Sequence, residues 1–223
     1  VSVEYNPSGM SFNNDGTKMF VVGYSNDYVS EYNLTTSFDL STASYAFNTE
    51  RFFVGNQEAT PTGLTFNNDG TKMFVSGSDG DEVNEYSLST AFDVSTATYV
   101  QNFSVSNEDT NPNEIVFNHD GTKMFVVHAP GTATISEHAL TTAFDINTAS
   151  QSTTYDISSH ISEPRGIRFN SDGTKLYISS SGDSNKKIHE FSLSTAYDVS
   201  SLPTPSSTVI TNPDNKPRGF TFN

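Results

Sequence analysis

Hydrophobic and polar positions alternate along much of the chain, and no stretch of ten or more residues keeps the 3.6-residue period of a helix. In the second quarter, residues 63–67 alternate and residues 72–77 form a short apolar run, as in a strand covered on both faces. Residues 82–88 and 99–105 read as two further strands. Asn68-Asp69-Gly70 predicts a tight hairpin turn, because glycine adopts positive φ at little cost. The pattern therefore predicts four antiparallel strands in about 52 residues.

This pattern recurs along the whole chain, so the protein is built from repeats of one unit. The segment FNNDGTKMFV begins at Phe12 and at Phe66, and close variants begin at Phe117 and Phe169. A second segment, EYSLSTAFDVSTA at Glu85, has a counterpart in each unit. We place the repeat units at residues 7–60, 61–111, 112–163 and 164–216, with residues 217–223 starting a fifth.

A four-stranded sheet of this size cannot shield both faces from water alone, whereas sheets packed around a common axis cover one another. We therefore predict an all-β protein, with residues 1–223 forming a single β-propeller domain or part of one, made of four-stranded antiparallel blades. The start of a fifth unit exceeds a closed four-blade ring, so we expect an excerpt of a propeller of roughly six to eight blades. A compact four-blade ring and a β-solenoid are the alternatives.

The composition restricts the partners that such a protein binds. With 26 acidic and 11 basic residues the formal net charge is −15, which repels nucleic acids and anionic membranes. No apolar run approaches the ~18 to 20 residues of a membrane-spanning helix. The chain has no cysteine, which excludes disulfides, thiolate catalysis and cysteine-ligated zinc. We therefore expect neither a nucleic-acid partner nor membrane insertion.

Polar residues that recur in every unit are interpreted as structural, because a functional site usually breaks the symmetry of a repeat. One aspartate precedes each turn glycine and can bond the backbone of its own turn. A second closes a later turn, and a glutamate on the third strand can pair with a lysine on the second. These residues are Asp15, Asp69, Asp120 and Asp172; Asp39, Asp93, Asp145 and Asp198; Glu31, Glu85, Glu137 and Glu190; and Lys18, Lys72, Lys123 and Lys175.

Candidate ligand-binding residues lie in the loops that vary between units. The loops between the second and third strands, and those between units, emerge on one face of a propeller. Tyr24 and Tyr28 belong to the first variable loop, where exposed rings can stack on sugars. Arg165 and Arg218 follow prolines in later units and interrupt an otherwise acidic rim. We therefore select these four residues as candidates for ligand binding.

The acidic rim contains a candidate calcium site. Carboxylate and carbonyl oxygens are the ligands that calcium prefers, and Glu58, Glu114 and Glu163 are the carboxylates we would test first. Glu108 and Asp109 belong to the same rim, which can also be a solvated edge. The five histidines lack a recognised metal-ligand spacing and are interpreted as packing residues. No nucleophile elbow or phosphate-binding loop is present.

The segments DGTKMFV and YSLSTAFDVSTA resemble a propeller repeat of virion and tail-fibre proteins of marine bacteriophages and of large bacterial surface proteins. FNNDGTKMFV is also similar, more distantly, to the repeat of YVTN and lactonase-type propellers. The first resemblance implies a rigid adhesive or structural module on an extracellular assembly. The YVTN and lactonase-type repeat occurs both in enzymes and in surface-layer proteins.

Two functions remain open at this point. The favoured hypothesis is a non-enzymatic module, extracellular or on a virion, whose variable loops bind a host-surface glycan or protein. If such a module binds no host-surface molecule, we expect its partners to be other subunits of the same virion or surface assembly, including copies of itself. The alternative is a calcium-dependent lactonase-like or lyase-like propeller enzyme with carboxylates from several loops near the axis.

Overall fold

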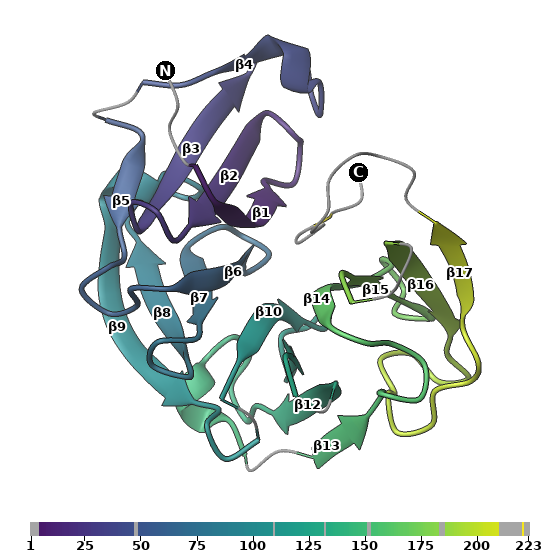
Figure 1. Ribbon diagram of the computed structural model, residues 1–223. Coiled ribbons are helices and arrows are strands. Elements are labelled where there is room, and N and C mark those ends of the chain that lie inside the picture. The colour runs from purple at the N-terminus through teal and green to yellow at the C-terminus, as the bar shows by residue number, and fades with distance from the viewer. Residues whose placement is uncertain are drawn as a thin grey trace.

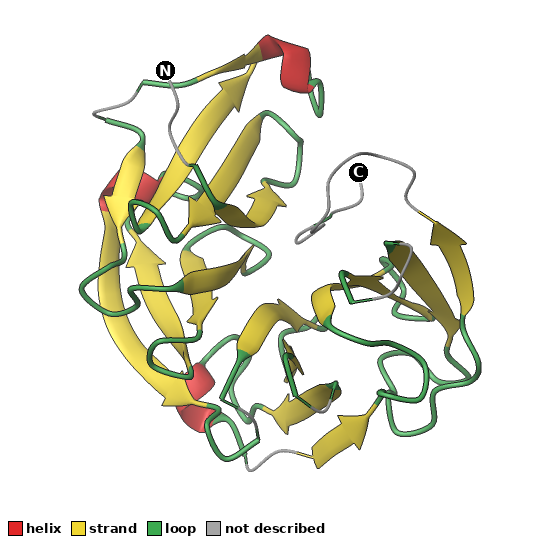
Figure 2. Cartoon of the chain, in the orientation of Figure 1, coloured by secondary structure: helices red, strands yellow, loops and turns green. Residues whose placement is uncertain are grey.

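A computed structural model describes residues 5–46, 49–108, 110–131, 133–150, 153–182, 186–209 and 220. Four antiparallel sheets are arranged in a ring as the blades of a β-propeller (Figure 1). Strands and loops make up nearly all of the described chain, and Figure 2 shows that the helical segments are single short turns. The predicted all-β propeller is therefore confirmed.

The strands of each blade follow the order of the sequence from the axis to the rim. Blade 1 contains β1 (Pro7–Phe12), β2 (Lys18–Gly23), β3 (Tyr28–Leu34), β4 (Ala43–Ser44) and β5 (Arg51–Phe53); blade 2 contains β6 (Pro61–Phe66), β7 (Lys72–Gly77), β8 (Glu82–Leu88) and β9 (Ala97–Ser104). Blade 3 contains β10 (Pro112–Phe117), β11 (Lys123–His128), β12 (Thr134–Ala139) and β13 (Thr153–Asp156); blade 4 contains β14 (Pro164–Phe169), β15 (Lys175–Ser180), β16 (Lys187–Ser192) and β17 (Ser206–Val209).

The outer strands differ from the sequence-based expectation in two details. The outer strand of blade 2 begins at Ala97, because a 3-10 turn, η2 (Val94–Thr96), ends directly before it. Similar turns, η1 (Leu40–Thr42) and η3 (Ile146–Thr148), precede the outer strands of blades 1 and 3. In blade 1 both β4 and β5 pair with β3, so its outer strand is divided. The expectation of an excerpt from a longer propeller stays a prediction.

The hydrophobic cores lie between neighbouring blades. One cluster joins blades 1 and 2 and includes Phe20 and Tyr86. A second joins blades 2 and 3 around Phe74 and Met124, and a third joins blades 3 and 4. Each sheet therefore buries its faces against the next sheet, which is the reason the repeat forms a ring.

The recurring turn residues are structural, as predicted. In blade 2, Asp69 Oδ1 accepts hydrogen bonds from Thr71 N at 2.9 Å and from the Thr71 hydroxyl at 2.5 Å. Gly70 has a φ of 72°, and a Cβ there would lie 2.2 Å from the Phe92 ring. Asp93 caps η2 by accepting from Ser95 N at 3.1 Å. The hairpin and the later turn are thus packed on each other at one end of the blade.

The recurring Lys–Glu pairs are also present, and they join blades. Lys72 Nζ lies 2.7 Å from Glu85 Oε1 and donates to the Phe144 carbonyl of the next blade at 2.7 Å. Glu85 Oε2 accepts from Ile146 N of that blade at 3.4 Å. Glu85 is buried, so the small stabilisation expected for an exposed ion pair does not apply to Lys72 and Glu85.

In the part of the chain that the structure describes, no helix has the length and apolar character needed to cross a bilayer.

Candidate functional site

A ring of polar side chains connects the inner strands at one end of the axis. In blades 1 to 3, the second residue of the inner strand donates to the carbonyl of the proline that opens the next inner strand. Ser8 Oγ donates to Pro61 O at 2.6 Å, and Thr62 Oγ1 donates to Pro112 O at 2.7 Å. Asn113 Nδ2 donates to Pro164 O at 3.2 Å. This end therefore contains buried hydrogen bonds between consecutive blades.

Arg165 occupies the corresponding position in blade 4 and breaks this pattern. Its guanidinium donates back to Asn113 Oδ1 from Nη1 at 3.1 Å and to Ser181 Oγ from Nε at 2.8 Å. Its Nη2 lies 3.3 Å from Glu163 Oε2. Three partners from two blades thus fix the orientation of a largely buried cation at the mouth of the axis.

A pocket of about 180 Å³ opens at this mouth, and all four blades contribute to it. We call it the axial pocket; it is lined by Tyr24, Thr60, Thr62, Ser78, Asn111, Asn113, Ala129, Pro130 and Arg165. Its lining is mainly hydroxyl, amide and guanidinium groups, with Tyr24 as its aromatic side chain. Such a surface is suited to a small polar ligand that bears a negative charge or many oxygen atoms.

The two tyrosines selected from the first variable loop lie in different surroundings. Tyr24 is exposed and lines the axial pocket. Tyr28 lies on β3, where the Arg51 guanidinium covers its ring at 4.2 Å and Phe53 packs at a centroid distance of 5.1 Å. The expectation of an exposed stacking ring at Tyr28 is therefore corrected, because its face is covered by neighbouring side chains.

Glu58 is fully buried and organises the loops around the axial pocket. Its carboxylate accepts from Thr60 N at 2.7 Å, from Asp79 N at 3.1 Å and from Gly80 N at 3.3 Å. Burial raises its pKa, and the three amide donors oppose that effect. Glu58 thus holds the loop before β6 against the loop between β7 and β8, rather than standing on an open rim.

Glu163 lies beside the axial pocket and has an unusual backbone. Its φ is 48°, in the left-handed region that residues other than glycine seldom adopt. Its Oε2 accepts from the Ser181 hydroxyl at 3.2 Å besides pairing with Arg165. About half of its side chain is exposed, at 48%. A water-accessible carboxylate is therefore held next to a fixed guanidinium.

Glu114 lies inside the axis and pairs with Arg168, which sequence reasoning missed. Arg168 Nη2 lies 3.2 Å from Glu114 Oε2 and donates to Met10 O of blade 1 at 3.2 Å. Glu114 Oε1 accepts from Leu64 N of blade 2 at 3.2 Å. Burial raises the pKa of Glu114, and the Arg168 charge lowers it. This pair thus connects all four inner strands.

The described carboxylates do not fit the predicted calcium site. Glu58 is bonded to backbone amides, Glu114 is paired with Arg168, and Glu163 is paired with Arg165. Within the described ranges, no group of three or more His, Asp or Glu side chains could hold a metal ion. The three glutamates therefore have separate roles, and we derive no chemistry from calcium.

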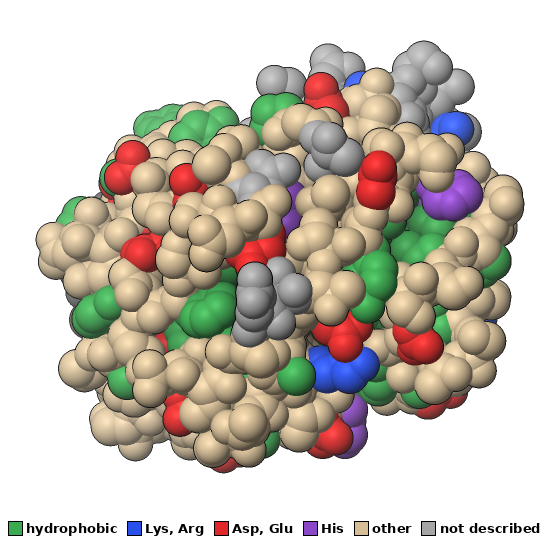
Figure 3. All heavy atoms as spheres, turned by 90° about the horizontal axis from the view of Figure 1, so that it is seen from below, with side chains coloured by type: hydrophobic (Ala, Val, Ile, Leu, Met, Phe, Trp, Pro, Cys, Tyr) green, Lys and Arg blue, Asp and Glu red, His purple; other side chains and the backbone are tan. Residues whose placement is uncertain are grey.

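A second basic side chain of blade 4, that of Lys186, lies close to Arg165. Lys186 Nζ donates to the Ser181 carbonyl at 2.6 Å, and Ser181 is also a partner of Arg165. Lys187 begins β16 beside it. Elsewhere acidic side chains are spread over the surface, and Figure 3 shows few lysines and arginines among them on one face. Arg218 and Asp109 lie outside the described residues.

Comparisons with known proteins show the fold. No family model matches the chain, and no curated protein matches it either. Among solved structures, a candidate 6-phosphogluconolactonase from Bacteroides fragilis aligns with a TM-score of 0.58 at 15% identity, over 92% of this chain and 53% of the other. The periplasmic gluconolactonase of Pseudomonas aeruginosa aligns with a TM-score of 0.54 at 12% identity, over 90% and 53%. Hydrazine synthase of Kuenenia stuttgartiensis aligns with a TM-score of 0.53 at 13% identity, over 92% and 53%.

These comparisons correct two sequence-based predictions. The non-enzymatic virion or tail-fibre module was wrong, because these structures include lactonases and support the alternative hypothesis. The prediction of no enzymatic activity is corrected on the same finding. The likeness to lactonase-type propellers is confirmed at the level of the fold. This chain spans about half the length of the structures that it matches, at 53% of each.

Proposed function

We propose that this chain belongs to a lactonase-like propeller enzyme and that its axial pocket binds the lactone of a sugar acid. The observation that carries the proposal is the fixed guanidinium of Arg165, with the carboxylate of Glu163 beside it, at the mouth of the axis. Structural neighbours that are named as a gluconolactonase and as candidate 6-phosphogluconolactonases support this class of substrate. Arg165 and Tyr24, selected from the sequence, both line the proposed site.

Glu163 and Arg165 can supply the general base and the oxyanion stabiliser that lactone hydrolysis requires. Glu163 would accept a proton from the attacking water, which adds to the lactone carbonyl. The guanidinium of Arg165 would stabilise the oxyanion that forms on the carbonyl oxygen. The ring C–O bond then breaks, the departing alkoxide takes up the proton that Glu163 accepted, and the product is the open sugar acid. Asn113 and Ser181 keep the guanidinium oriented throughout, which limits reorganisation during the reaction.

The charge distribution favours a lactone that carries a negative charge. The formal net charge of −15 repels anions from most of the surface. Arg165 and Lys186 both bond to Ser181, which places two positive charges of blade 4 close together at the axial pocket. We therefore expect 6-phosphogluconolactone to be a better substrate than gluconolactone, and the difference to shrink as the salt concentration rises.

Initial rates of hydrolysis of the two lactones test this proposal. Relative to the spontaneous reaction, we expect the protein to accelerate hydrolysis. Arg165→Gln should lower kcat by ~10² to 10³ through loss of the oxyanion contact. Glu163→Gln should lower it by ~10² to 10⁴ through loss of the base.

Arg51→Gln is the matched control, because Arg51 lies over Tyr28, outside the lining of the axial pocket. It removes a positive charge and should leave the rates unchanged. Equal rates with and without the protein, for both lactones, would refute the proposal. Equal rates for the native protein and Arg165→Gln would refute the assigned site.

A further inference from the structure

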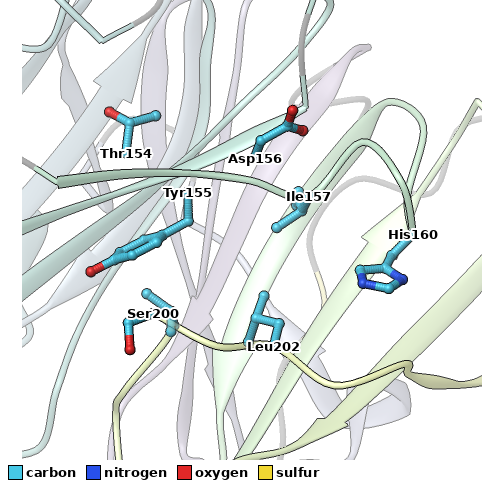
Figure 4. Close-up of a pocket in the computed structure, with 8 residues that line it drawn as sticks. Thr154, Tyr155, Asp156, Ile157, His160, Ser200 and Leu202 are labelled. Atoms are coloured by element: carbon cyan, nitrogen blue, oxygen red, sulfur yellow. The ribbon is translucent and has the colours of Figure 1, made fainter.

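A second cavity, of about 290 Å³, forms a groove between the rim of blade 3 and blade 4 (Figure 4). One wall consists of four consecutive residues, 154–157, at the end of β13. The opposite wall contains Val199, Ser200 and Leu202, from the connection between β16 and β17. His160 also lines the groove and packs edge-on against Phe191 at a centroid distance of 6.0 Å. None of these residues lines the axial pocket.

The groove lies at the third interface between blades, where Tyr155 packs against the core cluster that contains Phe191 but the 3-10 turn of the first two interfaces is absent. At those interfaces an aromatic side chain of the outer strand packs on the third strand of the next blade. Phe52 contacts Tyr86 at 5.4 Å between centroids, and Phe103 contacts His138 at 5.0 Å. The 3-10 turns η2 and η3 also contact the outer strands β5 and β9 there. In blade 4 the corresponding residues, 198–202, form no 3-10 turn.

The wall formed by β13 is the free edge of a sheet. Among the strands that the structure describes, β13 is the last of blade 3 and pairs on one edge only, with β12. Successive side chains of a strand point to opposite faces, yet all of residues 154–157 line the groove. The groove therefore follows the edge of the strand rather than one face. A strand edge of this kind can pair with the main chain of an added strand.

The interior of the groove suits one large apolar side chain. Ile157 and Val199 are buried beneath it, and Leu202 is half-buried. Figure 4 shows Tyr155 and Ile157 on one side of the gap, opposite Ser200 and Leu202. A side chain inserted here would replace water on an apolar floor and could place a ring against Tyr155.

Two carboxylates make the groove negative: Asp156 lines it, and Asp198 directly precedes Val199 of the opposite wall. Asp156 Oδ1 accepts from Ser158 N at 2.8 Å, and Asp198 Oδ1 accepts from Ser200 N at 2.9 Å. Hydrogen bonds from the side chains of Ser158 and Ser200, and then from their backbone amides, lower the pKa of both carboxyl groups, so both are ionised at neutral pH. Together with the net charge of the protein, they attract a basic partner.

We propose that this groove binds an extended basic peptide of a partner protein, which adds a strand to the edge of β13. One aromatic side chain of the peptide occupies the space between Ile157 and Leu202. Basic residues on either side of it lie near Asp156 and Asp198. This interface lies at the rim and is independent of lactone binding at the axis.

The experiment uses a synthetic pentapeptide with phenylalanine at the centre, lysine at both ends and threonine between them. Binding to the isotope-labelled protein is followed by amide chemical shifts in NMR titrations. We expect shifts at residues 154–157 and 199–202. Replacing the central phenylalanine by alanine should weaken binding by about tenfold or more, because the buried ring is lost.

Three variants distinguish this site from non-specific binding. Leu202→Trp fills the groove and should weaken binding by about tenfold or more, whereas Leu40→Trp, at an exposed position of η1, should not. The amide spectrum of each variant shows whether it is folded. Asp156→Lys together with Asp198→Lys reverses both charges and removes the two hydrogen bonds from Ser158 N and Ser200 N, and should also weaken binding.

Two results would overturn the proposal. One is an unchanged affinity in the folded Leu202→Trp or double-lysine variant. The other is that phenethylammonium alone binds as tightly as the peptide, which would make the groove a small-molecule site without a role for the strand edge.

Discussion

Three charged side chains near the axis replace small, apolar or uncharged polar residues of the other repeats. In the alignment of the repeats, Glu114 corresponds to Gly9, Gly63 and Gly166. Arg165 corresponds to Ser8, Thr62 and Asn113. Arg168 corresponds to Ser11, Thr65 and Val116. Turn aspartates, in contrast, recur in all four units and bond their own turns. The departures from the repeat therefore identify the site better than the type of residue does.

One buried histidine, His128, makes the free energy of unfolding depend on pH. His128 is fully buried, its Nε2 lies 2.8 Å from Ser136 Oγ, and burial lowers its pKa to about 4. The unfolded chain binds a proton at this residue below about pH 6.5. Its contribution to stability is therefore complete above that pH and is lost as the pH falls towards 4. The loss amounts to about 2–3 kcal/mol of the free energy of unfolding.

Urea denaturation of the native protein and His128→Gln at pH 7 and pH 4.5 measures this effect. The native protein should lose more free energy of unfolding than the variant between the two pH values. Comparison with the variant matters because burial raises the pKa of Glu31, Glu58 and Glu114, which act in the opposite direction. His119→Gln, at an exposed turn, controls for removal of an imidazole. An identical pH dependence for the native protein and His128→Gln would show that this histidine does not contribute.

At the scale of the secondary-structure elements, the main feature is the close approach of neighbouring inner strands. A Cβ on Gly63 would lie 2.8 Å from the Cα of Glu114, so only glycine fits between β6 and β10 at this point. The Glu114 carboxylate crosses from β10 towards Leu64 on β6 and Arg168 on β14. The ion pair is enclosed by protein, where leaving one charge unpaired costs more than the pair itself contributes.

Removing one partner of this pair should therefore destabilise the protein strongly. Glu114→Gln keeps the shape and an acceptor oxygen but leaves the Arg168 charge uncompensated, and should cost about 3–5 kcal/mol of the free energy of unfolding. Glu114→Gln combined with Arg168→Met should recover much of that loss, because neither charge remains. Chemical denaturation of the three proteins provides the comparison. A single variant as stable as the native protein would show that the pair does not join the blades energetically.

Local patterns predicted the elements well, because they depend on residues that are near in sequence. The turn at Asp69 and Gly70 and the pairing of Lys72 with Glu85 were both expected from their positions in the repeat. The partner of Glu114 was not, because Arg168 lies 54 positions later and meets it only when the inner strands surround the axis. The covered face of Tyr28 was missed for the same reason, since Arg51 comes from a different strand.

At the scale of the whole molecule, the arrangement of the blades brings the residues of the proposed site together. Repetition places the second residue of every inner strand at one mouth of the axis, where Thr62, Asn113 and Arg165 surround a polar pocket. The sequence selected Arg165 and Tyr24 but could not show that they share this pocket. From the sequence, the lactonase-like hypothesis was the alternative, because the repeated scaffold with variable loops and the resemblance to phage proteins favoured a non-enzymatic module, and its candidate calcium ligands were Glu58, Glu114 and Glu163. The structure assigns those carboxylates to separate partners.

Titration of the protein with 6-phosphogluconate, the stable product of the proposed reaction, tests the central claim most directly. Amide chemical shifts should change at Thr62, Asn113 and Arg165, and the folded Arg165→Gln variant should bind at least about tenfold more weakly. Absence of binding, or shifts confined to residues away from the axis, would contradict the assignment of a sugar-acid site to the axial pocket.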